Sequence, residues 1–379
     1  MIKVSVVVPV FDNARDLRRC LDSLTRQSLP PEEYEVVIID DGSTDESGMI
    51  ADAASRRHPQ IHVRHQENSG WPGQPRNSQP RNKGLDLAQG EYVFFCDADD
   101  WLADHALELM YRFAVEHDLD IVVGKMLGVG RAVPHVLFTR TRPLASFDDA
   151  PLMDSLTAHK LFRRELLERQ GIRFPEGRRR LEDHIFVVGA YCAASRIGVF
   201  SDEPCYFHTR RSDGGNISSQ PPHWPSYFDS LTEAITIIEA HIAPGPLRDK
   251  TLVRWLRVEM VRGLSGRQFL RRDPADARAL FDAAHRVAAE HFGPGVISRL
   301  QPAERPVARA LLAGDYDELE AIAAMVASQE ESTRLAANPP SSETSRSRIR
   351  EIERITRQFA GSVARSVGHH IRPARRATE

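Results

Sequence analysis

The chain has 379 residues, 41% of them hydrophobic, and a formal net charge of -3 at pH 7. This length suits two domains with cores of their own, and the small net charge gives no electrostatic reason to expect nucleic acid as a partner. Four scattered cysteines argue against disulfides or a zinc site, and no apolar run resembles a signal peptide or approaches the roughly 20 residues of a membrane span, so we expect a cytoplasmic protein.

The first hundred residues alternate between apolar runs and amphipathic stretches. The predicted elements are strands at residues 3–10, 34–39, 61–65 and 92–96 and helices at residues 15–27, 47–57 and 82–88. Strands that alternate with helices build parallel sheets with right-handed crossovers. The pattern therefore predicts an α/β domain with a mostly parallel, Rossmann-like sheet.

Acidic residues follow three of these strands. Asp12 follows the first, Asp41 the second, and the pair Asp97 and Asp99 the fourth. Open α/β sheets usually bind ligands at the carboxyl ends of their strands, so we expect these acids at one ligand-binding edge. Two carboxylates that flank one small residue can bind a hard cation, which in turn neutralises a phosphate-rich ligand. Taken alone, the motif fits an acidic turn equally well.

The rest of the chain is less regular. Its sequence pattern predicts a helix at 101–117, a strand at 121–123, a helix within 153–170 and two short strands in 196–207. Helices are then predicted near 226–242, 246–271, 274–292, 303–312 and 315–327. A Pro-rich break at 220–225 separates the two patterns. We divide the chain into a catalytic domain (1–220), a mainly α-helical domain (221–335), and a flexible link with a tail (336–379).

The tail predicts a basic amphipathic helix. Between residues 349 and 367, apolar side chains recur every three or four positions among arginines. Such a helix docks on its own protein or on a second copy, which would make a homo-oligomer. The alternative is peripheral contact with an anionic membrane at its inner face.

Five segments, by their order and spacing, resemble the signature series of the family 2 inverting glycosyltransferases, which have the GT-A fold. They are Val-Ser-Val-Val-Val-Pro-Val-Phe-Asp-Asn at 4–13, Asp-Asp-Gly-Ser-Thr-Asp at 40–45, Pro-Arg-Asn-Lys-Gly at 80–84, Gly-Glu-Tyr-Val-Phe-Phe-Cys-Asp-Ala-Asp-Asp at 90–100, and Glu-Asp-His at 182–184. The resemblance covers roughly the first 220 residues. It implies transfer of a sugar from a nucleotide sugar, usually a UDP-sugar, with Mn²⁺ or Mg²⁺ as cofactor.

The resemblance also assigns the donor site. Pro9, Phe11, Asn13 and Asn68 would line the nucleotide pocket, and the carboxylate of Asp41 would accept a hydrogen bond from uracil.

Arginines would bind the diphosphate. The segment Gln-Pro-Arg-Asn occurs twice, five residues apart, so either Arg76 or Arg81 is the counterpart of the family's arginine. Arg210 and Arg211 lie in the segment that covers the diphosphate in this family.

The metal site would centre on the Asp-x-Asp motif. Asp97 and Ala98 would contact the nucleotide, while Asp97 and Asp99 would face the metal, with Asp99 the stronger candidate ligand. His208 is a further candidate ligand, although a structural role is the alternative. Asp100 is expected to cap the next helix.

Asp183 is the candidate general base. Inversion in one displacement needs a carboxylate that removes the acceptor's proton while cations stabilise the leaving diphosphate. Glu182 is expected to pair with an arginine, such as one of 178–180, and His184 to fix the loop. The alternative is that Glu182 and Asp183 only cap a helix that starts at Ile185.

Two further features narrow the expected function. The Gln-x-x-Arg-Trp motif of processive family members is absent, so one sugar per encounter is expected. The Asn-Ser-Gly-x-x-Gly loop and the Glu-Asp-His trio are most similar to bacterial enzymes that add N-acetylhexosamine to wall teichoic acid, which implies a glycopolymer acceptor. The alternative to a glycopolymer acceptor is a lipid-linked oligosaccharide or a small natural product. Two other classes of protein are alternatives to a glycosyltransferase: a non-catalytic sugar-nucleotide binding protein and a nucleotidyltransferase.

Overall fold

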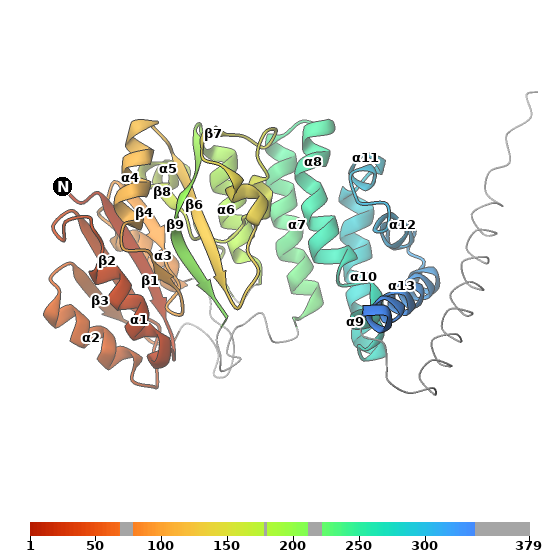
Figure 1. The fold of residues 1–379 in the computed structure, drawn as a ribbon, viewed down its shortest axis with the longest axis horizontal. Coiled ribbons are helices and arrows are strands. Elements are labelled where there is room, and N and C mark those ends of the chain that lie inside the picture. Colours follow the sequence, from red (N-terminus) through yellow and green to blue (C-terminus); the bar gives the residue numbers. More distant parts are fainter. Residues whose placement is uncertain (69–78, 178–179, 211–221, 338–379) are drawn as a thin grey trace, which may run out of the picture. The chain divides into compact units, whose positions relative to one another are not determined.

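The computed structural model describes residues 1–68, 79–177, 180–210 and 222–337, and the chain forms two compact units, 1–251 and 252–379 (Figure 1). The strands are β1 (Val4–Val10), β2 (Tyr34–Asp40), β3 (Ile61–His65), β4 (Tyr92–Phe95), β5 (Trp101–Leu102), β6 (Ile121–Val129), β7 (Arg142–Ala145), β8 (Leu161–Arg163) and β9 (Ile197–Thr209). The helices of the first unit are α1 (Ala14–Thr25), α2 (Ser47–Arg57), α3 (Gln79–Leu87), α4 (Ala106–Glu116), α5 (Arg164–Arg169), α6 (Glu182–Ala193) and α7 (Trp224–His241), with short 3₁₀ turns η1 (His135–Thr139) and η2 (Leu152–Asp154).

One sheet runs through the first unit, in the order β3-β2-β1-β4-β8-β6-β9-β5. The four strands predicted in the first hundred residues pair in parallel, as expected. The strand order reverses between β1 and β4, because β2 and β3 lie on one side of β1 and β4 on the other. This is a topological switch point, the place where open α/β sheets bind ligands.

The second half of the sheet is mixed. β8 is antiparallel to both β4 and β6, whereas β6 and β9 are parallel. The α/β fold class is thus confirmed, but some expected elements differ. The two short strands expected in 196–207 form the single strand β9, and β8 lies inside a stretch where only a helix was expected. A three-residue strand is too short to show a period of its own.

Packing places α3 close to the sheet. The continuous apolar runs of β1 and β2 are buried throughout, as a strand covered on both faces requires. Gly84 of α3 faces Val7 of β1, and a Cβ at residue 84 would lie 2.3 Å from Val7 Cγ1. Only glycine permits this approach, so Gly84 sets the position of α3 and of Arg81 on it.

The second unit is built from helices. They are η4 (Leu256–Val261, a π-helical segment), α9 (Gly266–Leu270), α10 (Pro274–His291), α11 (Pro294–Ser298), α12 (Arg305–Ala313) and α13 (Tyr316–Ala337), preceded by α8 (Pro246–Trp255). The single helix expected over 246–271 is wrong, because η4 and a turn interrupt it before α9. The turn ends at Gly266, whose φ of +67° lies in the left-handed region that favours glycine. α7, assigned to the helical domain from the sequence, packs against α6 in the first unit (Figure 1).

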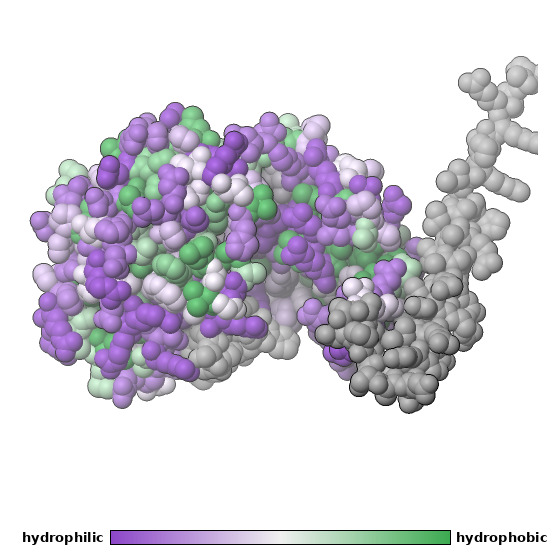
Figure 2. All heavy atoms as spheres, viewed as in Figure 1, coloured by the Kyte–Doolittle hydropathy of each residue, from purple (hydrophilic) through white to green (hydrophobic). Residues whose placement is uncertain are grey.

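Hydrophilic side chains cover much of the visible face of the first unit, with apolar residues scattered between them (Figure 2). Among the described residues, no helix is both long and apolar enough to cross a membrane. The expected tail helix over 349–367 lies outside the described residues.

Candidate active site

The switch point between β1 and β4 holds the acidic residues predicted there, but they do different things. Asp12 turns its carboxylate to the loop after β2, where it accepts the backbone N–H groups of Thr44 (2.7 Å) and Asp45 (3.3 Å). Asp45 in turn accepts the N–H of Ser47 (2.8 Å) at the start of α2. Asp12 therefore holds the loop rather than offering a free carboxylate.

The predicted nucleotide-binding residues lie around this loop. Asp41 is 1% exposed, and its carboxylate accepts a hydrogen bond from Gln66 Nε2 (2.6 Å). Asn13 is 2% exposed, and both polar atoms of its side chain lack a hydrogen-bond partner among the described residues. Pro9 is buried and Phe11 half-buried beside it. A buried amide without partners is costly, so this position suits a polar ligand that completes its hydrogen bonds.

Arg81 joins the two acidic motifs. Its guanidinium donates to Asp97 Oδ1 (2.8 Å) and forms ion pairs with Glu182 Oε1 (3.6 Å) and Asp183 Oδ1 (4.0 Å). Burial alone would lower the pKa of Arg81, but the charges of Asp97, Asp183 and Glu182 outweigh burial and raise it. Arg81 is thus a permanent cation between the Asp-x-Asp motif and the candidate base. The competing Arg76 lies outside the described residues.

The two carboxylate oxygens of Asp183 differ in their hydrogen bonds. Its Oδ2 accepts the backbone N–H of Ala158 (3.2 Å), while Oδ1 is shielded from solvent and accepts no hydrogen bond from any described residue. Asp183 lies in the first turn of α6, which starts at Glu182, three residues before the expected start. Burial, and then the charge of Asp183, raise the pKa of Glu182 to about 7. The expected pairing of Glu182 with an arginine is confirmed, with Arg81 as the partner.

Asp100 does not cap a helix, so that expectation is wrong. Its carboxylate is 1% exposed and accepts hydrogen bonds from Tyr206 Oη (2.6 Å), the Thr209 N–H (2.6 Å) and His208 Nδ1 (3.0 Å). The aspartate thereby ties the end of β9 to the loop after β4. Because Nδ1 of His208 donates to a carboxylate, its Nε2 keeps the lone pair that a metal would need.

The acidic cluster fits a divalent cation. Asp97, Asp99 and Asp100 each place one carboxylate oxygen within 4.8 Å of the others. Three donors contact the carboxylate of Asp100, and Arg81 contacts one oxygen of Asp97. Carboxylate oxygens are the ligands that Mn²⁺ and Mg²⁺ prefer.

Two residues of the site were missed from the sequence. His159 stacks on Tyr206 (ring centroids 4.3 Å apart, 14° between planes), and its Nε2 lies 3.6 Å from Asp97 Oδ2. Burial lowers the pKa of His159. Lys160 has no exposed surface and donates to Ser155 Oγ (3.1 Å) and to the carbonyl of Thr157. The available signal was a polar His-Lys pair directly before an apolar strand.

Of the remaining predicted residues, the structure describes Ala98, Asn68 and Arg210. Ala98 is fully buried, and Asn68 is exposed next to Gly42. Arg210 is exposed, and its backbone N–H donates to the carbonyl of Val129 (3.0 Å). Arg211, together with residues 178–179, lies outside the described part of the chain.

Residues 5–202 match the model of glycosyl transferase family 2, which is more than half of the chain. The chain therefore belongs to this family. Residues 225–323 match a second model, the glycosyl transferase TarS linker domain.

Named relatives share these parts. The chain is 35% identical over 243 residues to poly(ribitol-phosphate) beta-glucosyltransferase of Bacillus spizizenii, covering 63% of this chain and 37% of that protein. It is 32% identical over 308 residues to poly(ribitol-phosphate) beta-N-acetylglucosaminyltransferase TarS of Staphylococcus aureus, covering 80% and 52%. The chain thus spans about half, or less, of the length of these relatives. The crystal structure of S. aureus TarS 1-349 in complex with UDP-GlcNAc superposes with a TM-score of 0.76 at 28% identity, covering 88% of this chain and 92% of that one.

Proposed function

We propose that the chain is an inverting glycosyltransferase that moves N-acetylhexosamine from a UDP-sugar to a hydroxyl of a poly(ribitol phosphate) chain. The observation that carries the proposal is Asp183 Oδ1, a buried carboxylate oxygen that accepts no hydrogen bond from a described residue and lies 4.0 Å from Arg81. Such an oxygen can take a proton, and no described residue donates a hydrogen bond to it.

The donor would lie at the switch point. Uracil would complete the hydrogen bonds of Asn13 and face Asp41, with Pro9, Phe11 and Asn68 around it. Arg81 is already fixed by three carboxylates, and it would stabilise the diphosphate electrostatically. Arg210, and outside the described residues Arg76 and Arg211, are the further candidate contacts.

A divalent cation would be held by Asp97 and Asp99, with His208 Nε2 as a candidate third ligand. When bound, it supplies positive charge that neutralises the diphosphate. Ala98, which lies between Asp97 and Asp99 in the sequence, is buried and has only a methyl side chain.

The chemistry then follows in one displacement. Asp183 Oδ1 takes the proton of the acceptor hydroxyl as that oxygen bonds to the anomeric carbon. The bond from the anomeric carbon to the phosphate oxygen breaks, and UDP leaves with its electron pair. Arg81 stabilises the charge that develops on UDP, and attack opposite to the leaving group inverts the configuration.

Two findings favour this donor and acceptor. The relatives that cover most of the chain have names that specify poly(ribitol-phosphate), and the TarS structure that covers 88% of the chain was solved with UDP-GlcNAc. One relative is named as a glucosyltransferase, so UDP-glucose is the competing donor.

The test measures UDP release from a panel of UDP-sugars with Mn²⁺, with and without poly(ribitol phosphate). We expect release from UDP-N-acetylglucosamine that the polymer increases, and a loss of ~10²–10⁴-fold in Asp183→Asn, because a general base contributes about that much. Asp52→Asn is the matched control and should keep the parent rate. The Asp52 carboxylate, on α2, contacts His65 rather than any residue of the candidate site.

Turnover within a few-fold of the parent in Asp183→Asn would remove Asp183 as the base. UDP release that the polymer never increases would instead reject the acceptor and leave the donor assignment standing.

A further inference from the structure

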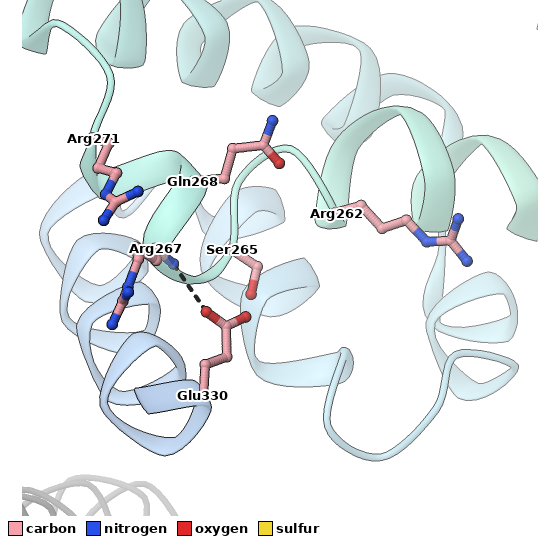
Figure 3. Close-up of a pocket in the computed structure, with 6 residues that line it drawn as sticks. All are labelled: Arg262, Ser265, Arg267, Gln268, Arg271 and Glu330. Atoms are coloured by element: carbon pink, nitrogen blue, oxygen red, sulfur yellow. Dashed lines mark hydrogen bonds between the residues drawn. The ribbon is translucent and has the colours of Figure 1, made fainter. Parts of the chain in front are cut away.

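The helical unit carries a hollow with an arginine-rich lining. The cavity, of about 570 Å³, is lined by Arg262, Ser265, Arg267, Gln268, Arg271 and Glu330 (Figure 3). Three of these side chains are cationic and one is anionic, in a chain whose formal net charge is -3. The hollow is therefore a local basic site on a protein with a slight negative charge.

The cations of this arginine hollow differ in availability. Arg267 is occupied, because its guanidinium pairs with Glu331 and its backbone N–H donates to the carboxylate of Glu330 (3.3 Å). Arg262 and Arg271 are exposed, and neither guanidinium group forms an ion pair or hydrogen bond with any described residue. Glu330 and Glu331 together outweigh the charge of Arg267, so Arg262 and Arg271 are the two cations of the lining whose side chains have no ionic partner among the described residues.

The two free arginines lie on opposite sides of the hollow. Figure 3 shows Arg262 at one side and Arg271 at the other, with Ser265 and Gln268 between them. A single phosphate is bound best where donors converge on it. Separated cations instead suit successive charges along one chain, and the hydroxyl and amide between them can hydrogen-bond to its hydroxyl groups.

We propose that the arginine hollow binds the backbone of a polyol phosphate chain, with Arg262 and Arg271 on successive phosphates. The site would hold the acceptor polymer on the helical unit, and this part of the inference rests on the function proposed above. A polymer held by one segment presents its other hydroxyls at a raised effective concentration. The hollow would thus favour long acceptors over short ones.

The test uses the full chain and fluorescently labelled poly(ribitol phosphate), with affinity measured by anisotropy at several salt concentrations. Arg262→Glu and Arg271→Glu should each weaken polymer binding roughly tenfold, the loss expected for a charged hydrogen bond. Each should also flatten the salt dependence, because fewer counterions are released. Arg309→Glu is the control, because Arg309 is exposed on α12 and lies outside the lining of the hollow. This substitution changes the net charge by the same amount as the other two.

Equal affinities in Arg262→Glu, Arg271→Glu and Arg309→Glu would overturn the proposal, even if sugar transfer to the polymer occurs. Binding of single-stranded RNA as tight as that of the polymer, lost in the same variants, would overturn the polyol chemistry. Polymer binding that fails only in the two hollow variants would support the site, even in a chain without sugar transfer. The fate of the arginine hollow and that of the proposed reaction are therefore separable.

Discussion

At the scale of single residues, Lys160 is a buried ammonium group next to the candidate base. Its ammonium group donates hydrogen bonds to Ser155 Oγ and the carbonyl of Thr157, and the adjoining Ala158 N–H holds Asp183 Oδ2. Lys160 thus fixes the segment that positions the base. Burial lowers the pKa of Lys160 to about 7, although the charge of Asp183 opposes this shift.

This pKa predicts a pH dependence of stability. Because the folded-state pKa lies below the ordinary lysine value of 10.5, the free energy of unfolding should rise as pH increases from about 7 toward 10.5. Stability is highest above the unfolded pKa and is lost as pH falls through the folded pKa. In Lys160→Met this rise should be absent, which urea unfolding of parent and variant at several pH values would measure.

Lys160→Arg serves as the comparison, since arginine stays charged throughout this range and should also lack the rise. A rise that persists unchanged in Lys160→Met would assign it to another group and contradict the prediction.

Asp100 supports a second prediction. Its carboxylate accepts three hydrogen bonds, and one of them orients His208. In Asp100→Asn the amide nitrogen cannot accept, so at least one buried donor loses its partner, at a cost of about 1–3 kcal/mol. Loss of such an orienting partner typically weakens metal binding by about 10–100-fold. Titration of Mn²⁺ in the presence of UDP, followed by electron paramagnetic resonance, measures this.

Thr25→Ala is the control, because its hydroxyl bonds locally to the carbonyl of Asp22 on the exposed side of α1. Parent-like Mn²⁺ affinity in Asp100→Asn would mean that His208 does not contribute to the metal site.

At the scale of elements, His65 of β3 connects two neighbours. Its Nδ1 lies 2.8 Å from Asp40 Oδ2 at the end of β2, and its Nε2 lies 3.1 Å from Asp52 Oδ1 of α2. The hydrogen bond with Asp40, and then the one with Asp52, raise the pKa of His65 above the ordinary value of 6.5. Protonated His65 therefore ties α2 to the edge of the sheet.

We expect this contribution to be fully present below about pH 6.5 and to fall as pH rises through the folded-state pKa. The effect should be small, since the side chain is 49% exposed and solvent screens the charges. In His65→Gln the parent's loss of stability across this window should shrink, as measured by urea unfolding. An identical pH profile in the variant would show that His65 titrates alike in the folded and unfolded chain.

The elements also show what the sequence could and could not predict. β1, β2 and β4 are buried on both faces, so each appears as a continuous apolar run, and their acids could be placed at one sheet edge. His159 could not be placed, because it enters the site through the antiparallel pairing of β8 with β4. A three-residue strand gives no periodic signal. The contact of Arg81 with Asp183 likewise depends on how α3 and α6 pack, which no local pattern encodes.

At the scale of the whole molecule, the two compact units predict two unfolding transitions. Residues 1–251 carry the proposed nucleotide site and residues 252–379 the arginine hollow, and each unit has its own buried core. Multidomain chains commonly depart from two-state unfolding. The transition of the first unit should have the larger enthalpy, because unfolding enthalpy scales with the number of residues.

A ligand that binds only one unit should stabilise only that unit. With UDP and Mn²⁺ at about a hundred times the dissociation constant, the larger transition should gain about 2.7 kcal/mol, while the smaller one stays in place. Poly(ribitol phosphate) held in the arginine hollow should instead raise the smaller transition. Differential scanning calorimetry resolves both shifts in one sample. A single transition that moves with either ligand would show that the units unfold together and would contradict this prediction. The two ligands would then be assigned to their sites by the charge-reversal variants.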